Sequence, residues 1–278
     1  MSRFAWRDLM SVDPDASTAF FTALFGWTEL PIESASGEAG AYRQLLNGDE
    51  LIGGVLRLDP ALGHPSHWVS AIDVTNLDAT VARAARLGGT IASPPSDLPG
   101  LGRLAALADK QGALFCALEW APGAIRPAER PEEPAPGSIA WNELLTADPS
   151  GAAAFYAKLF HWSQRTRTSP SGDYRVLSRD GQPEAGIIKR LPGMAISAWL
   201  IYFETADLDA SLARARALGL SVGQVAPLFD IDEAEDLVRL RALLAGRADL
   251  PATRAALAEL GLLDGAGAAA PHALTIPA

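Results

Sequence analysis

The chain repeats part of itself, and this internal repeat constrains the fold more than any other feature. Residues 4–27 recur without a gap at 139–162, 135 positions further along. Aromatic residues make up much of the match, and the matched pairs include Trp6 and Trp141, Trp27 and Trp162, Tyr42 and Tyr174, and Trp68 and Trp199. A repeat of this length indicates that the chain builds one supersecondary unit more than once.

The second copy of the repeat is shorter than the first. The correspondence ends near Val222, whereas the first copy continues through 99–120 with segments that have no counterpart later. We therefore predict a complete module over residues 1–125 and a truncated module over 138–225. The stretch 126–137 is rich in proline, which interrupts helices and strand pairing and favours an extended linker.

Within the first copy, the hydrophobic pattern predicts a strand, a helix and three strands, in that order, twice. Residues 4–10 alternate as a strand does, and Asp13-Pro14 starts a helix with a side-chain cap. Gly26 ends that helix, because glycine can take the left-handed backbone conformation. His161 stands at this position in the second copy, where the same backbone would lower stability by roughly 1 kcal/mol. The other predicted elements are strands 28–33, 41–46, 51–58, 68–74, 91–93, 103–108 and 114–120 and a helix over 76–87. Paired βαβββ units predict an α+β fold.

Composition narrows the functional classes. The chain is 49% hydrophobic and 20% charged, as globular proteins are. Its net charge of −10, with no run of lysine and arginine, argues against nucleic acid and anionic membranes as partners. No apolar run approaches the roughly 20 residues that span a bilayer, and Arg3, Arg7 and Asp8 stand where a secretory signal would be apolar. Cys116 is the single cysteine. We expect a cytoplasmic protein without disulfides.

Several motifs occur in both copies: an Asp-Pro pair after the first strand, a Leu-Phe-x-Trp end to the first helix, and Leu-Asp-Ala at the start of the second helix. Together with the Gly-Arg and Gly-Ala-Leu-Phe segments that close the first copy, they resemble the vicinal oxygen chelate superfamily over residues 1–225. The resemblance is strongest to its tandem glyoxalase/bleomycin-resistance-like members. It implies half-barrels of paired βαβββ units whose concave face holds a small ligand, often with a divalent metal.

The resemblance also implies where a metal would bind. Chelating members use His or Gln on the first strand, Glu on the fourth, His on the fifth and Glu on the eighth. We expect no cofactor here, because no chelating set occupies these positions, and His64 and His67 are expected to be surface residues. A divalent metal stays the alternative, since a two-residue shift would bring in Asp8 and Glu143. The residues at the family positions are Trp6, a glycine near Gly54, Val69 and Cys116 in the first copy and Trp141, Gly186 and Leu200 in the second, which has no counterpart for the eighth strand.

Aromatic residues beside carboxylates are the candidates for ligand binding. Trp6 shares a face with Asp8, and Trp141 shares one with Glu143, so that a ring offers apolar area and an acid fixes the orientation of a ligand. The alternative is core packing for the tryptophans and a salt bridge for the acids. No catalytic residue is assigned. The predicted ligand-binding residues are Trp6, Asp8, Tyr42, Arg43, Arg103, Trp141, Glu143 and Arg175.

The arginines in this set have two interpretations. Arg43 and Arg175 follow a tyrosine on the third strand of each copy. Either arginine would meet Asp8 or Glu143 across the sheet as a bidentate pair, or it would form a structural ion pair elsewhere. Arg103 opens the seventh strand beside a glycine-containing lip where a ligand could enter.

Two other polar residues have mainly structural interpretations. Asp73 ends the fifth strand, where it would contact a ligand or cap the following helix. Cys116 has no base beside it in the sequence, so that buried filling is expected instead of nucleophilic catalysis.

The last part of the chain has a different character. Two helices are predicted within 226–264, and 265–278 is rich in Gly, Ala and Pro and is expected to be disordered. The tail resembles the C-terminal end of nucleotidyltransferase-like glycosyltransferases, which indicates a fusion. That family's nucleotide-binding loop is missing, so that no transferase activity is inferred from Asp230 and Asp232. The truncated module would expose a sheet edge that the tail covers or through which the protein self-associates.

These observations favour a metal-free protein that binds a small organic molecule in the first module. The alternative is an enzyme of the same fold, a glyoxalase-like lyase, hydroxylase or dioxygenase, possibly metal-dependent and using Asp8 and Glu143. A second alternative is a protein-interaction module. We expect a monomer of two modules or weak self-association through the second module.

Overall fold

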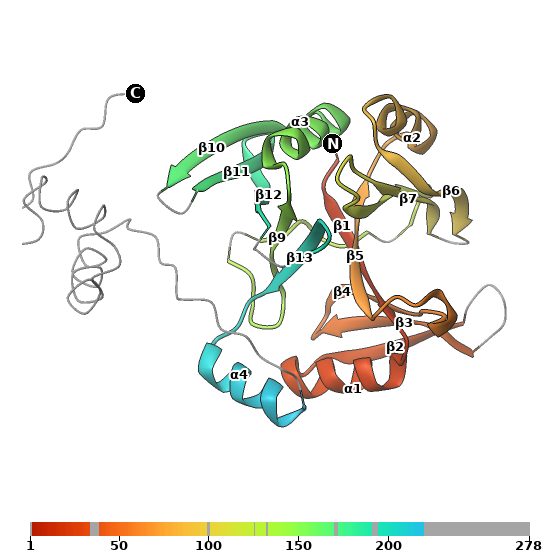
Figure 1. The fold of residues 1–278 in the computed structure, drawn as a ribbon. Helices are drawn as coiled ribbons and strands as arrows, with labels where there is room; N and C mark the ends of the chain where they lie inside the picture. Colours follow the sequence, from red (N-terminus) through yellow and green to blue (C-terminus); the bar gives the residue numbers. More distant parts are fainter. Residues whose placement is uncertain are drawn as a thin grey trace, which may run out of the picture. The chain divides into compact units, whose positions relative to one another are not determined.

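The computed structural model describes residues 2–219 apart from 34–38, 99–100, 125, 132, 170–171 and 191–193. The predicted tail helices and disordered end lie outside the described residues. Both copies of the repeat belong to one compact unit, residues 1–222 (Figure 1). In the part of the chain that is described, no helix has the length and apolar character needed to cross a bilayer.

The first copy forms an eight-stranded sheet. Its elements are β1 (Phe4–Ser11), α1 (Pro14–Phe25), β2 (Thr28–Glu33), β3 (Ala39–Asn47), β4 (Glu50–Arg57), the short helix η1 (Pro60–Leu62), β5 (His67–Asp73), α2 (Leu77–Arg86), β6 (Thr90–Leu98), β7 (Gly102–Ala108) and β8 (Leu114–Trp120). The strand order is β2-β3-β4-β1-β5-β8-β7-β6. Antiparallel pairing of β1 with β5 joins two βαβββ units, as the α+β prediction requires.

The second copy forms a separate five-stranded sheet. Its elements are β9 (Ile139–Thr146), α3 (Pro149–Phe160), β10 (Ser163–Ser169), β11 (Gly172–Arg179), β12 (Gln182–Lys189), β13 (Ala198–Phe203) and α4 (Leu208–Ala217). The strand order is β10-β11-β12-β9-β13, and it matches the order β2-β3-β4-β1-β5 at one end of the first sheet. Among the described residues β13 is therefore an edge strand, and it exposes 38% of Leu200 and 44% of Tyr202.

The helix ends follow the predicted chemistry. Asp13 caps α1 by accepting a hydrogen bond from the Ala16 amide, and Gly26 ends it at a φ of 77°. His161 takes the same left-handed conformation at the end of α3, with a φ of 59°. The second copy thus keeps the backbone of the first although a non-glycine residue is strained there.

A β-bulge changes the face that Phe4 occupies. Strict alternation predicts Phe4 beside Trp6, but β1 carries one residue more than β5 between these two positions. Phe4 consequently lies in the core between the copies, and Ala5 joins Trp6 instead. This part of the predicted strand face was wrong because a local bulge is not visible in residue alternation.

Strand β6 is longer than the predicted 91–93 because its prolines are tolerated. It runs through Pro94 and Pro95 to Leu98 at the edge of the sheet. An edge strand does not need every amide for pairing, and the register with β7 shifts around the prolines.

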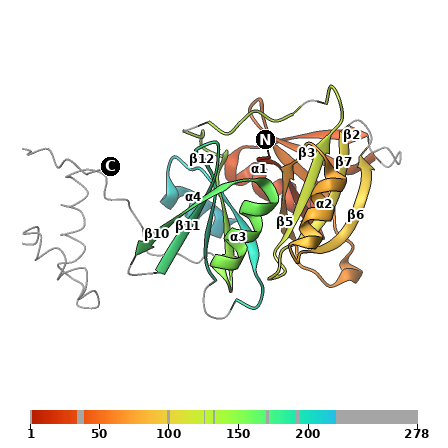
Figure 2. The ribbon, with the colours of Figure 1, turned by 90° about the horizontal axis from the view of Figure 1, so that it is seen from above.

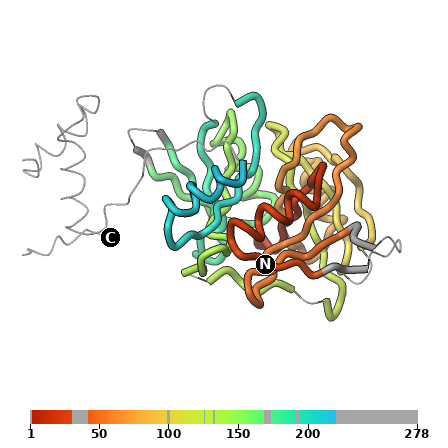
Figure 3. Tube along the Cα trace, turned by 90° about the horizontal axis from the view of Figure 1, so that it is seen from below, coloured from red at the N-terminus to blue at the C-terminus, as the bar shows by residue number. Residues whose placement is uncertain are grey.

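The two copies share hydrophobic cores. Helix α3 of the second copy lies beside α2 of the first (Figures 1 and 2). The Tyr156 ring on α3 packs edge-on against Phe115 of β8, with ring centroids 5.4 Å apart. Likewise α1 lies beside α4 (Figure 3), and Phe25 on α1 packs 5.3 Å from Phe203 of β13. Each copy thus covers apolar side chains of the other.

The repeated tryptophans join the copies by reciprocal hydrogen bonds. Trp27 is fully buried, and its Nε1 donates to the Gly137 carbonyl oxygen at 3.0 Å. Its counterpart Trp162 donates to the Ser2 carbonyl oxygen at 2.8 Å. Each tryptophan follows the first helix of one copy and bonds a carbonyl two residues before the first strand of the other.

Matching arginines make a second reciprocal pair of contacts. Arg83 on α2 donates to the Leu159 carbonyl oxygen at 3.1 Å, and Arg214 on α4 donates to the Leu24 carbonyl oxygen at 2.7 Å. Both carbonyls lie in the last turn of a helix, where they lack intrahelical partners and where a cation is favoured. The repeated arginines thus stabilise the helix ends of the opposite copy.

Replacing Trp27 by phenylalanine tests these contacts. The Trp27→Phe variant leaves the Gly137 carbonyl without its indole donor and leaves a gap in the core, so that the free energy of unfolding should fall by about 2–3 kcal/mol. Urea unfolding of the full chain, followed by circular dichroism, measures this loss. The matched Trp162→Phe variant should lose a similar amount, and a loss below about 0.5 kcal/mol in both would contradict the reciprocal-contact interpretation.

Candidate functional site

Three polar side chains meet on the face of the first sheet opposite α1 and α2, here called the helix-free face. Trp6 Nε1 donates to Asp8 Oδ1 at 2.8 Å and lies 3.0 Å from the Tyr42 hydroxyl. The Tyr42 hydroxyl donates to the same Asp8 oxygen at 3.0 Å. Both bonds go to Oδ1, and within the described residues Oδ2 accepts none. The cluster therefore holds a carboxylate in place with one oxygen left for a further partner.

Strand register assembles this cluster. Asp8 pairs with Gly54 on β4 and with Val69 on β5. A Cβ atom at Gly54 would lie 2.1 Å from the Tyr42 hydroxyl oxygen, so that only glycine lets the tyrosine reach Asp8. The glycine at a predicted metal-ligand position thus has a structural cause.

Apolar side chains surround the polar cluster. Trp120 at the end of β8 packs edge-on against Trp6, with ring centroids 6.3 Å apart. Cys116 pairs with Ala71, the residue of β5 that pairs with Trp6. The other apolar residues of this cluster are Ala5, Leu51, Leu98, Leu101, Leu104, Leu118 and Ala124. The helix-free face therefore presents aromatic and aliphatic area around a single carboxylate.

Burial shifts the protonation of these groups. Desolvation raises the pKa of Asp8, although the hydrogen bonds from Trp6 and Tyr42 oppose the shift. Burial, together with the nearby Asp8 charge, raises the pKa of the Cys116 thiol to about 12. Cys116 is consequently a thiol at neutral pH, which agrees with a filling role and not with a nucleophile.

The second copy builds a similar cluster from the matching residues Trp141, Glu143 and Tyr174, with Tyr202 in addition. Trp141 Nε1 donates to the Tyr174 hydroxyl at 2.9 Å, and the Tyr202 hydroxyl donates to Glu143 Oε2 at 2.6 Å. Burial, and next the charge of Glu143, raise the pKa of Tyr174. Gly186 again stands under the tyrosine, since a Cβ there would lie 2.0 Å from its hydroxyl.

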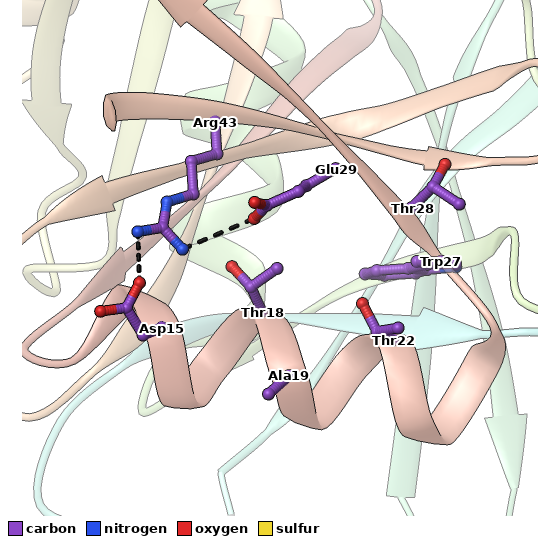
Figure 4. Close-up of a pocket in the computed structure, with 8 residues that line it drawn as sticks. All are labelled: Asp15, Thr18, Ala19, Thr22, Trp27, Thr28, Glu29 and Arg43. Atoms are coloured by element: carbon purple, nitrogen blue, oxygen red, sulfur yellow. Dashed lines mark hydrogen bonds and ion pairs between the residues drawn. The ribbon is translucent and has the colours of Figure 1, made fainter. Parts of the chain in front are cut away.

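Arg43 does not reach Asp8. It forms ion pairs with Asp15 on α1 and with Glu29 on β2, the latter at 3.5 Å, and Figure 4 shows its guanidinium between these two carboxylates. This groove between α1 and the β2–β3 hairpin has a volume of about 420 Å³. The bidentate pairing with Asp8 was wrong because neighbouring residues on a strand point to opposite faces, and Tyr42 takes the helix-free one. The structural ion pair, the alternative interpretation, is what forms.

The other predicted arginines also lie apart from the clusters. Arg175 donates to Thr166 Oγ1 at 3.0 Å and lies 3.8 Å from Asp173, so that it too takes the structural interpretation and not the pairing with Glu143. Arg103 donates to both carboxylate oxygens of Asp78 on α2, at 2.8 and 3.1 Å. Arg103 therefore ties β7 to a helix.

The remaining polar candidates have structural roles. Asp73 accepts a hydrogen bond from the Arg3 amide at 2.7 Å and does not cap α2, which Asn76 caps instead. His64 is exposed, as expected. His67 is the first residue of β5 and not a loop residue, and its Nδ1 lies 2.8 Å from the Pro65 carbonyl oxygen.

Two aromatic residues of the clusters were missed by sequence reasoning. Tyr202 aligns with an alanine, Ala71, in the first copy. Trp120 lies in the segment 99–120, which has no counterpart in the second copy. The repeat therefore gave no signal for either residue. The strand alternation of Leu200 and Tyr202 is the one signal that could have drawn attention to Tyr202.

Comparison with known proteins agrees with the fold. Residues 3–117 match the family model of the Glyoxalase/Bleomycin resistance protein/Dioxygenase superfamily. The anthracycline biosynthesis protein DauV of Streptomyces sp. (strain C5) is 31% identical over 245 residues, which cover 80% of this chain and 86% of DauV. The chain belongs to this superfamily. The putative glyoxylase CFP32 of Mycobacterium tuberculosis is also 31% identical, over 79% of this chain and 82% of CFP32.

Solved structures show the same fold at low sequence identity. The Mn(II)-bound glyoxalase from Novosphingobium aromaticivorans covers 80% of this chain, with 74% of its own length matched, at a TM-score of 0.53 and 17% identity. A variant of 4-hydroxymandelate synthase from Streptomyces coelicolor covers 78% of this chain, with 75% of its own length matched, at a TM-score of 0.51 and 14% identity. A glyoxalase and a 4-hydroxymandelate synthase therefore share the architecture.

Replacing Asp8 by asparagine tests the buried carboxylate. Because burial raises the folded-state pKa of Asp8, its ionisation opposes folding, and this penalty is absent below the ordinary carboxyl pKa of about 4. The penalty grows as the pH rises through the folded-state pKa. The Asp8→Asn variant should therefore have a higher Tm than the wild type at pH 7, and the difference should vanish near pH 4.

The exposed residue Asp15 supplies the matched control. Its pKa is lowered, first by the hydrogen bond from Arg43, so that Asp15→Asn should lower the Tm at pH 7 and have less effect in acid. Thermal unfolding of the three proteins between pH 4 and 8 measures both trends. An Asp8→Asn variant that is less stable than the wild type at pH 7 would contradict the assignment of a desolvated carboxylate.

Proposed function

We propose that the chain binds a small organic molecule on the helix-free face of the first sheet, without a metal ion. The observation that carries the proposal is the register of that face, which places Asp8 beside Gly54 and Val69. Gly54 and Val69, two of the residues at the positions that the resemblance gives for a metal, thus lie beside a single ionic oxygen donor, Asp8, which is set among tryptophan rings.

The donor set does not fit a divalent metal. Zn, Ni, Fe and Mn sites need three or more nitrogen, oxygen or thiolate ligands that converge. In the first copy, within the described residues, only Asp8 and Cys116 stand near these positions, which is fewer than the three ligands that such a site needs. Across the described ranges of the chain, no three His, Cys, Asp or Glu side chains are grouped so as to hold a metal. No step of the proposed function therefore depends on one.

The chemistry of the face favours an aromatic ligand with a polar substituent. Trp6 and Trp120 are only 5% and 7% exposed, so that a ligand would meet the exposed margins of these rings, and Asp8 Oδ2 offers an acceptor for a hydroxyl or amine. Two Streptomyces relatives are named for anthracycline biosynthesis, and anthracyclines are flat fused-ring aromatic compounds. Hydroxylated fused-ring aromatics are thus the first compounds to test.

An enzyme of the glyoxalase type is the second candidate, and the raised pKa of Asp8 favours it. A carboxyl group whose pKa moves toward neutrality is better suited to transfer protons than an exposed one. One relative, CFP32 of Mycobacterium tuberculosis, is named a putative glyoxylase, and this name supports the second candidate. A catalytic role would show as turnover that Asp8→Asn abolishes while binding persists.

A thermal-shift screen of the full chain with hydroxylated fused-ring aromatics, including an anthracycline, tests ligand binding. We expect a compound that raises the Tm of the wild type, with at least tenfold weaker binding to Asp8→Asn, about 1.4 kcal/mol. Glu143→Gln is the matched control in the second copy and should bind as the wild type does. Equal binding by all three proteins would remove Asp8 from the site.

Metal analysis of the purified protein tests the other half of the proposal. Inductively coupled plasma mass spectrometry should find well below one equivalent of Zn, Ni, Fe or Mn per chain, with and without prior incubation in each metal. Near-stoichiometric metal that is lost in Asp8→Asn would overturn the metal-free interpretation. The same samples in light scattering would report the expected monomer or the self-association of the second module.

A further inference from the structure

The copies enclose a second cavity away from the helix-free face. It lies where β1, β9 and β12 approach the proline-rich linker and has a volume of about 570 Å³. Four arginines line it, Arg3, Arg7, Arg130 and Arg179, together with the two carboxylates of Glu129 and Glu184. We propose that this intermodule cavity binds the phosphate group of a small organic phosphate. The proposal is independent of the ligand site at Asp8.

Arg7 is the residue that points to an anion. Only 9% of it is exposed, and its side chain makes one hydrogen bond, from Nη2 to Asn142 Oδ1 at 3.1 Å. Its Nε is buried without a partner, and Arg7 forms no ion pair with any residue that the structure describes. Burial lowers its pKa to about 10, so that the guanidinium remains charged at neutral pH. The charges of Glu184 and Glu50 act on Arg7 only from beyond ion-pair distance. Burial of this cation is therefore costly, and an anion bound against its guanidinium would offset that cost.

The other three arginines are held in place around the cavity. Arg3 donates to the carbonyl oxygens of Pro127 and Ala128 in the linker, at 2.6 and 3.3 Å. Arg179 donates to Glu184 at 2.8 Å and to Glu129 at 3.3 Å. These two acids therefore pair with Arg179, and Arg3 lies 3.9 Å from Asp73, a residue outside the cavity lining. Among the described residues, Arg7 and Arg130 thus line the cavity without an ion pair.

Arg130 adds a flat surface to the cavity. It donates to the Pro183 carbonyl oxygen at 3.1 Å, also contacts the Ala140 carbonyl oxygen, and lies over the Trp141 ring, 5.3 Å from its centroid. Guanidinium groups bind phosphate oxygens in a forked geometry, and the Trp141–Arg130 pair offers a plane for an organic group. The cavity volume lies in the range of small-molecule sites and exceeds the need of a bare phosphate ion.

Calorimetric titration of the full chain with phenyl phosphate and with inorganic phosphate, at constant ionic strength, tests the proposal. We expect both to bind, phenyl phosphate more tightly, and at least tenfold weaker binding of each to Arg7→Met. Arg130 is exposed on the linker, so that Arg130→Ala should fold normally and weaken phenyl phosphate at least threefold. This second variant keeps the test decisive if Arg7→Met does not fold.

Two controls separate this site from other charges and from the Asp8 site. Arg103→Ala removes a half-exposed arginine that pairs with Asp78 outside the cavity and should bind phenyl phosphate as the wild type does. Asp8→Asn should also bind it normally, whatever it does to ligands of the helix-free face. Absence of binding to the wild type, or equal binding by the wild type, Arg130→Ala and Arg103→Ala, would overturn the proposal.

Discussion

The exchange of contacts between the two copies is the constraint on which the rest of the structure depends. Trp27 and Trp162 each leave their own copy to bond a backbone carbonyl of the other, and Arg83 and Arg214 do the same at helix ends. These are the residues that the repeat preserves most visibly. The interface also contributes aromatic area from α1 and α3 to both sheets. The first module consequently has a complete sheet but not a complete core of its own.

Duplication leaves each copy with a cluster of a tryptophan, an acid, a tyrosine and a glycine at matching positions. The two clusters differ in their surroundings. The first is closed by Trp120 and by apolar residues of β7 and β8, whereas the second has no such strands among the described residues and uses Tyr202 to bond Glu143. An acid enclosed by Trp120 and by apolar residues of β7 and β8 is thus found in the first copy, which is why the proposed ligand site is placed there.

The intermodule cavity arises from divergence at one matched position. Arg7 stands where the second copy has Asn142, and the two side chains bond to each other between β1 and β9. The resulting cation has a neutral partner on the opposite strand, and Arg3, Arg130 and Arg179 come from three other parts of the chain. Acidic overall composition therefore coexists with a local positive cavity, and the two proposed sites use opposite charges on different surfaces.

The sequence by itself determined the βαβββ units, their helix caps and the position of Trp6 and Asp8 on the same face of one strand. Periodicity, capping and spacing along one strand are local properties. The tertiary structure decided which face each neighbour of these residues takes. A bulge moved Phe4 into the core, alternation sent Arg43 and Arg175 away from the acids, and strand register placed Gly54 under Tyr42. The arginine cavity was equally invisible, since its members lie up to 176 positions apart, as Arg3 and Arg179 do. Such groupings depend on how strands and copies pack, which no single stretch of residues encodes.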